Sequence, residues 1–287
     1  MRPIITVGVG GSGGWSALAW ATEQAAATRA KLVLCHVCPP GSALADRRSG
    51  TPIRLLELFD PALARAVAST RTRLGDARVR LRLLPGDPGD VLLANARDAD
   101  LLVIGPSGRT SVDGTAGLAH RVATRAPCTV VVARPVSPGT DAPFAGHVVV
   151  GVDPTIAGHA ALEFGFRYAD THRLPLAAVR VTPVGQQPTD PADLALLATE
   201  VDPWLHKFPD VPVRSTEYVG DPGPDLLRVA TGARLLVVGD HGREVPPPVG
   251  SPWAPVTPLG EVSGSVIERA GCPVAVVPGW ERPGGRK

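Results

Sequence analysis

The sequence predicts an α/β protein built from two tandem domains, each a doubly wound parallel sheet of the Rossmann-like type. The first observation is an internal repeat: residues 86–109 and 220–243 align without a gap and are identical at 14 of 24 positions. The second is that uninterrupted Val, Leu and Ile runs alternate along the chain with helix-favouring segments. Uninterrupted apolar runs indicate strands buried on both faces, and strands separated by helices indicate parallel crossovers. In such sheets, ligands bind beyond the carboxyl ends of the strands.

A short linker separates the two copies. Residues 134–143 contain three prolines in ten positions, which favours a stiff connection. We therefore expect one domain at residues 1–138 and a second at residues 143–280.

The elements of each copy follow from local patterns. Residues 4–9 are β-branched, residues 16–30 are rich in alanine, and residues 61–74 carry Leu and Val at helical spacing. Asp87 followed by Pro88 predicts a helix N-cap and a first-turn proline, which opens a helix to about residue 97. Further strands are expected at residues 32–37, 101–104 and 129–133, and in the second copy at 148–152, 176–181, 214–219, 235–238 and 274–277.

Composition excludes several classes of protein. Hydrophobic residues make up 44% and charged residues 20% of the 287 residues, which is typical of folded domains. The 29 basic and 27 acidic residues give no charge argument for nucleic acid as a partner. No apolar run approaches the roughly 18 residues of a membrane span. Four cysteines do not make a disulfide framework, so we expect a cytoplasmic protein.

The first turn of the first copy, residues 8–13, has the pattern G-x-G-x-x-G. A dinucleotide site also needs an acidic residue about 20 positions further on. The second strand instead ends Cys35-His36-Val37-Cys38-Pro39, without a carboxylate, which argues against NAD. Neither copy contains G-K-[ST], so a P-loop is absent. Cys35 and Cys38 lie three apart on a strand, project to opposite faces, and are expected to be structural.

The turn that follows the expected strand at residues 101–104, and its counterpart after residues 235–238, carries a stronger signal. It reads Gly105-Pro106-Ser107-Gly108-Arg109 in the first copy and Gly239-Asp240-His241-Gly242-Arg243 in the second. Each copy later reaches a cysteine, Cys128 or Cys272, at the entry to its last strand. With these motifs the chain resembles the universal stress protein family in its tandem form.

The resemblance implies site residues that neither copy keeps intact. In the second copy Asp153, Gly239, Gly242 and Gly260 match, and Arg243, Glu261 and Ser263 lie beside them. In the first copy Gly105 and Gly108 match, but Gly10 replaces the aspartate. Glu261 stands where the family has Ser or Thr. Either it places a negative charge beside the expected phosphate, or it faces solvent at a helix N-terminus, where carboxylates are favourable.

Many members of the family bind ATP and others do not, so the resemblance implies ATP, with Mg²⁺, in the second copy before the first. It also implies an intramolecular pseudo-dimer in which residues 129–133 and 274–277 pair edge to edge. Pairing would cover an exposed apolar strand. The proline-rich insertion Glu244–Pro258 is expected to be a functionless lid, a ligand cover or a protein-docking element.

No catalytic set is placed by a motif, so we expect a non-enzymatic protein of stress response or regulation. Two alternatives stay open. One is a slow ATPase or nucleotidyl-transfer relative of the same fold, and the other is an interaction module that has lost its ligand.

Overall fold

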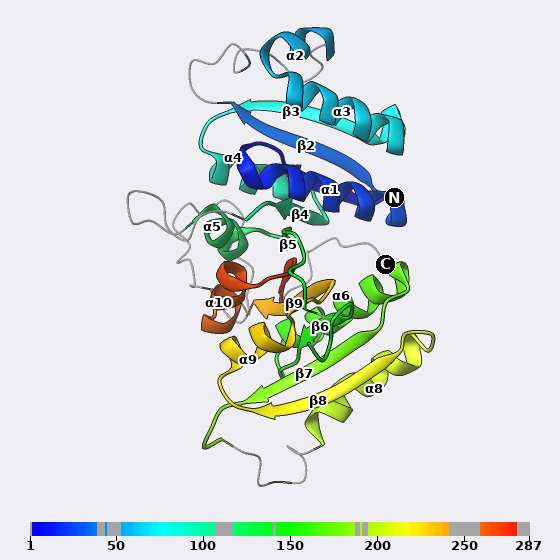
Figure 1. Cartoon of the computed structure of the whole chain (residues 1–287), viewed down its shortest axis with the longest axis vertical. Coiled ribbons are helices and arrows are strands. Elements are labelled where there is room, and N and C mark those ends of the chain that lie inside the picture. The colour runs from blue at the N-terminus through cyan, green and yellow to red at the C-terminus, as the bar shows by residue number, and fades with distance from the viewer. Residues whose placement is uncertain are drawn as a thin grey trace. The chain divides into compact units, whose positions relative to one another are not determined.

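The computed structural model describes residues 2–38, 44, 53–106, 117–139, 142–186, 190, 195–240 and 259–279. The chain divides into two compact units, Met1–Arg134 and Pro135–Lys287. Both units can be followed in Figure 1.

The first unit is an α/β domain in which all paired strands run parallel. Its described strands lie in the order β3-β2-β1-β4-β5. Along the chain the elements are β1 (Ile4–Gly8), α1 (Gly11–Thr28), β2 (Lys31–Cys38), α2 (Ile53–Phe59), α3 (Pro61–Leu74), a 3₁₀ turn (Asp76–Arg78), β3 (Val79–Pro85), α4 (Pro88–Ala96), β4 (Leu101–Ile104), α5 (Leu118–Arg125) and β5 (Thr129–Val132).

The second unit repeats this arrangement, with its described strands in the order β8-β7-β6-β9-β10 and again parallel. Its elements are β6 (Val148–Gly151), α6 (Ile156–His172), β7 (Leu176–Thr182), α8 (Leu196–Lys207), β8 (Val213–Val219), α9 (Pro222–Val229), β9 (Leu235–Asp240), α10 (Glu261–Arg269) and β10 (Val274–Pro278). Both units therefore have the Rossmann-like α/β fold that the sequence predicts.

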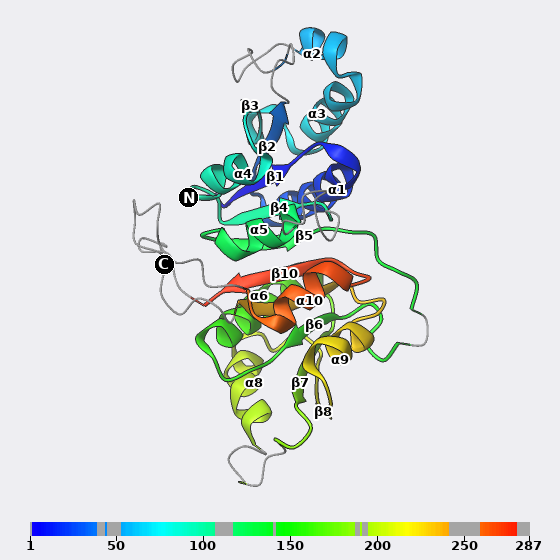
Figure 2. The same ribbon diagram turned by 90° about the vertical axis from the view of Figure 1, so that its left-hand side faces the viewer.

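Helices cover both faces of each sheet. In the first unit α1 packs with α3 and α4 packs with α5, and Figure 2 shows these two pairs on opposite faces of the sheet. In the second unit α6 packs with α8 and α9 with α10. The central strands β4, β6 and β9 are buried at every residue, as expected for strands covered on both sides.

The edge strand β3 differs from these central strands. β3 (sequence VRLRLLP) buries its first, third and fifth residues and leaves the residues between them more exposed. The sequence analysis, which looks for uninterrupted apolar runs, does not predict this strand, because arginine alternates with Leu and Val along it. That alternation is what a strand with one covered face requires.

A local signal sets the start of α4, whereas the start of α1 lacks one. Asp87 caps α4, since its Oδ1 accepts the N–H groups of Gly89 at 2.8 Å and Asp90 at 3.1 Å. The helix expected from residue 16 in fact begins at Gly11, after Gly10 as N-cap.

The linker residues after Arg134 belong to the second unit, where the N–H of Ser137 donates to the carbonyl of Gly271 at 2.7 Å.

Candidate functional site

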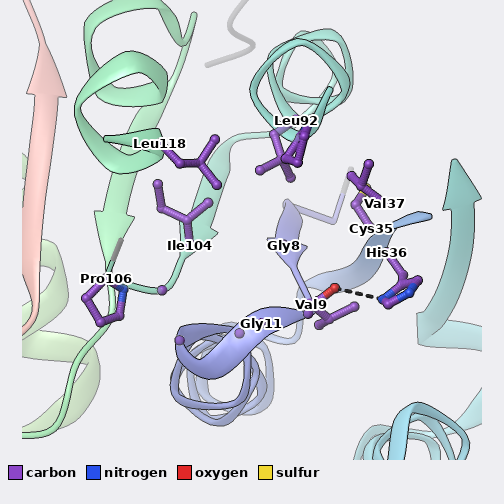
Figure 3. A pocket seen from close by; sticks show the side chains of 15 residues that line it. Gly8, Val9, Gly11, Cys35, His36, Val37, Leu92, Ile104, Pro106 and Leu118 are labelled. Atoms are coloured by element: carbon purple, nitrogen blue, oxygen red, sulfur yellow. Dashed lines mark hydrogen bonds between the residues drawn. The ribbon is translucent and has the colours of Figure 1, made fainter. Parts of the chain in front are cut away.

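A cavity of about 570 Å³ lies at the carboxyl ends of β1, β2 and β4 in the first unit (Figure 3). The strand order β2-β1-β4 makes this the point where the chain reverses direction across the sheet. Doubly wound sheets bind ligands at such a switch point, where loops diverge to opposite faces. The cavity's volume falls within the range of roughly 300–1,000 Å³ that is usual for small-molecule sites.

Glycine backbone forms the floor of the cavity. Gly13, at the start of α1, and Gly105, directly after β4, approach so closely that a Cβ on Gly105 would lie 2.6 Å from the Cα of Gly13. A Cβ on Gly13 would in turn lie 2.7 Å from the carbonyl oxygen of Pro106. Only glycine permits this approach, because any side chain would overlap the opposing backbone. The predicted site residue Gly105 therefore acts by letting two turns meet.

The remaining walls of the cavity are mostly apolar. The helices α1 and α5 begin at the same end of the unit, where the cavity lies. Val37, Leu92, Ile104 and Leu118 are among the lining residues, and none of the described lining residues is acidic. The N-caps of α1 and α5 are glycines, which supply no side-chain cap, and among the described residues neither helix has an acidic residue in its first turn. The first N–H groups of a helix lack internal partners and attract anions. These walls suit a ligand with an apolar part and an anionic part.

An ion pair joins the two helices that frame the cavity. Nη2 of Arg121 on α5 lies 2.5 Å from Oδ1 of Asp87 at the start of α4. Partial burial acts to raise the pKa of Asp87, but hydrogen bonds from the Asp90 N–H and from Arg121 outweigh it, and the pKa is lowered. The pair ties α4 to α5 beside Pro88 and Leu118, which line the cavity.

In the second unit, Asp153 organises the start of α6. Its Oδ1 accepts the N–H of Thr155 at 3.1 Å and also the hydroxyl of Thr155. The Thr155 hydroxyl oxygen then accepts the N–H of Gly158 at 3.0 Å and caps the helix. Part of the hydrogen-bonding capacity of Asp153 is therefore used within its own turn, and α6 begins with a side-chain cap that α1 lacks.

Four other predicted residues lie at the end of β9 or the start of α10 in the second unit. The hydroxyl of Ser263, 1% exposed, donates to the carbonyl of Gly239 at 2.7 Å and ties α10 to the end of β9. A hydroxyl carries one proton, so Ser263 has only acceptor capacity left for a ligand. Gly260 is the N-cap of α10, and Glu261 is its exposed first residue. The position of Glu261 fits the interpretation of a carboxylate in solvent at a helix N-terminus.

Several predicted features fall outside the part of the chain that the structure describes. These are Gly108 in the first copy and Gly242, Arg243 and the insertion Glu244–Pro258 in the second.

Sequence reasoning missed the side chain that gives the first-unit cavity its polarity. His36 lines the cavity at the end of β2, and its Nδ1 lies 3.0 Å from the carbonyl oxygen of Val9 (Figure 3). In the sequence, residues 35–39 argue against NAD and Cys35 and Cys38 are expected to be structural, but no motif assigns a role to His36. Cys35 also lines the cavity; burial raises the pKa of its thiol to about 11, opposed by the charge of Arg82.

Two kinds of site are absent from the described residues. They hold no group of three or more His, Cys, Asp or Glu side chains placed to bind a metal ion. No helix within them has the length and apolar character that a membrane crossing requires.

The fold defines a tandem α/β protein with doubly wound parallel sheets, and the first unit has a cavity at the carboxyl edge of its sheet. The universal stress protein family matches the chain twice, at residues 1–134 and 145–278, so the chain belongs to the universal stress protein family.

Relatives of known name agree with this assignment. A universal stress protein of Mycobacterium tuberculosis is 27% identical over 95% of this chain and 96% of its own length. A second from the same organism is 25% identical over 79% of this chain and 82% of its own. Among solved structures, a universal stress protein of Archaeoglobus fulgidus shares the fold with a TM-score of 0.66, at 15% identity and 96% coverage of both chains.

Proposed function

We propose that this protein binds an adenine nucleotide without turning it over, as a regulator in the stress response, and that the first-unit cavity is its main binding site. The observation that carries the proposal is the cavity itself. It combines apolar walls, two helix starts without side-chain caps, and no described acidic lining residue. A nucleotide presents a flat apolar base and an anionic phosphate chain, which match these two kinds of wall.

The proposed nucleotide site lies in the first unit, whereas the sequence motifs favour the second. In the second unit the corresponding helix starts carry the Asp153–Thr155 cap and the Glu261 carboxylate. A carboxylate near a bound phosphate opposes binding, because like charges about 4 Å apart repel by about 1 kcal/mol in water and more where solvent is excluded. The charge balance therefore supports the first unit, although the sequence motif is better kept in the second.

Two matched variants separate the two sites. Leu118 and Glu261 each directly follow the glycine N-cap of the last helix of their unit. We expect Leu118→Trp, which fills the first-unit cavity, to weaken ATP binding to the full chain at least about tenfold, or 1.4 kcal/mol. Glu261→Trp should leave this affinity within about twofold. Isothermal titration with ATP and Mg²⁺ measures both.

The results of these titrations distinguish a first-unit site from the alternative functions. If Glu261→Trp alone abolishes binding, the nucleotide belongs to the second unit, as the motifs suggest. If the wild type binds no ATP and releases no nucleotide on denaturation, the chain is an interaction module without this ligand. Phosphate release that requires the intact cavity would instead support a slow ATPase.

A further inference from the structure

His36 is the polar side chain that distinguishes the first-unit cavity. Among the described residues that line it, the others are glycines, apolar side chains and Cys35, whose pKa burial raises to about 11. Among the described lining residues, His36 is therefore the one whose side-chain nitrogens can form hydrogen bonds with a bound ligand. Other hydrogen bonds must come from the backbone.

The ring of His36 is held in a defined way. The carbonyl oxygen of Val9 can only accept, so Nδ1, 3.0 Å away, donates and carries the proton (Figure 3). In the neutral imidazole Nε2 is then an acceptor. No described residue forms a hydrogen bond with Nε2. The N–H of Val9 donates to the carbonyl of Cys35 at 2.9 Å, so β2 holds this turn through two hydrogen bonds.

His36 also lies beside the position where the second copy has a carboxylate. A Cβ on Gly10, at φ 138°, would lie 3.5 Å from His36 Nδ1. Gly8 pairs with Cys35 and Gly151 pairs with Val179, so Gly10 corresponds to Asp153 and His36 to Arg180. The second copy therefore holds a carboxylate and a guanidinium at these two positions, where the first copy has only an imidazole.

The position of His36 in the fold indicates which part of a ligand it meets. β1 lies between β2, which carries His36, and β4, which leads into Pro106. Figure 3 shows His36 on one side of Gly8 and Gly11, with Pro106 and Leu118 on the other. The uncapped start of α5 lies on the side of Leu118, so an anionic group is favoured there. The opposite end of the ligand then faces β2.

We propose that His36 determines the ligand specificity of the first-unit cavity, with neutral Nε2 accepting a hydrogen bond from a donor on the nucleoside part of the nucleotide. This inference rests on the proposed function. The donor is a ribose hydroxyl or the amino group of the base, and both present the same chemistry to Nε2.

The test compares ligands and variants in the full chain. Isothermal titration at pH 8 uses ATP and three analogues: 2′-deoxy-ATP, 3′-deoxy-ATP and purine riboside triphosphate, which lacks the amino group. We expect the wild type to lose about 3- to 10-fold in affinity with at least one analogue, the size of one hydrogen bond. His36→Leu should bind ATP and that analogue equally, and His36→Gln should restore part of the difference, because its amide can accept.

His120→Leu is the matched control. His120 belongs to α5 of the same unit and does not line the cavity. This variant should keep the wild-type order of affinities. Since His36→Leu also removes the bond to Val9, thermal unfolding is followed in parallel.

If His36→Leu does not fold, ¹⁵N spectra of histidine-labelled wild type replace it, with His36→Gln assigning the signal. ATP should shift the Nε2 resonance of His36, and the discriminated analogue should not.

Three outcomes overturn the proposal. A wild type that binds all four ligands equally, or a His36→Leu variant that keeps the discrimination, removes the role of His36 and leaves nucleotide binding intact. A wild type that binds none of them removes the proposed function and this inference together.

Discussion

Gly105→Ala tests whether the close approach of two turns builds the first-unit cavity. An added Cβ would lie 2.6 Å from the Cα of Gly13, whereas ordinary contacts begin at 3.4 Å. The carbonyl oxygen and carbon of Gly13 would lie closer still, so the two backbones must separate by more than about 0.8 Å, the difference between these distances. The obstructing atoms are backbone and cannot rotate away. Overpacking of this kind costs about 1–3 kcal/mol of folding free energy.

The assay must report on the first unit alone. Hydrogen exchange followed by mass spectrometry resolves peptides of β1 and β4 from those of the second unit. We expect faster exchange of these peptides in Gly105→Ala, equivalent to a loss of about 1–3 kcal/mol. ATP affinity should fall as well, because Gly105 lines the cavity.

Gly223→Ala is the matched control in the second unit. Its Cβ would meet Ser265 at 3.4 Å, an ordinary contact, in the first turn of α9. We expect this change to be neutral or to stabilise by up to about 1 kcal/mol, because alanine restricts the unfolded chain. If Gly105→Ala exchanges like the wild type, or if both substitutions destabilise equally, the close approach does not determine the site.

Three further predictions concern single side chains. Asp87→Asn keeps an N-cap acceptor but removes the charge that faces Arg121 and the start of α4, so it should cost the first unit about 0.3–1 kcal/mol at pH 7. Because the pKa of Asp87 is lowered in the folded state, the wild type's advantage should be present above about pH 4 and disappear as the pH falls through the folded pKa, which pH-dependent urea unfolding measures. Burial raises the pKa of the Cys35 thiol to about 11, so Cys35 should resist iodoacetamide at pH 8 in the native protein and react once urea unfolds the chain. Rapid labelling of Cys35 in the native protein, detected by mass spectrometry, would contradict its burial. Glu261→Ser should lower the stability of the second unit by about 0.3–1 kcal/mol at low salt, because it removes a carboxylate from the N-terminus of α10; calorimetry showing no loss would mean that the carboxylate does not interact with the helix.

Much of the fold could be predicted from the sequence because its signals are local. The strand over residues 101–104 is apolar at every position, and the structure buries all four residues. Asp87 and Pro88 mark the start of α4 through hydrogen bonds and dihedral angles that involve only neighbouring residues. The repeat of residues 86–109 at 220–243 then extends these assignments to the second unit.

Edge strands and glycine-rich turns were harder to predict. β3 pairs with β2 from Leu32–Val79 to Cys38–Pro85, but its arginines hide the strand from a search for apolar runs. The start of α1 at Gly11 is equally hard to predict, since glycine has low helix propensity. Packing against the turn after β4, not propensity, places this helix start.

Only the tertiary structure could locate the cavity. Its lining comes from Gly13, His36, Leu92, Gly105 and Leu118, which belong to five separate elements or turns. A motif specifies residues that are near one another in the chain, and the best-kept motif lies in the second copy. A cavity is the volume left over when distant segments pack, and its polarity depends on which side chain reaches it. The sequence by itself determined the two-domain α/β fold and the family. Packing formed the first-unit cavity, with His36 as the polar side chain among its described lining residues.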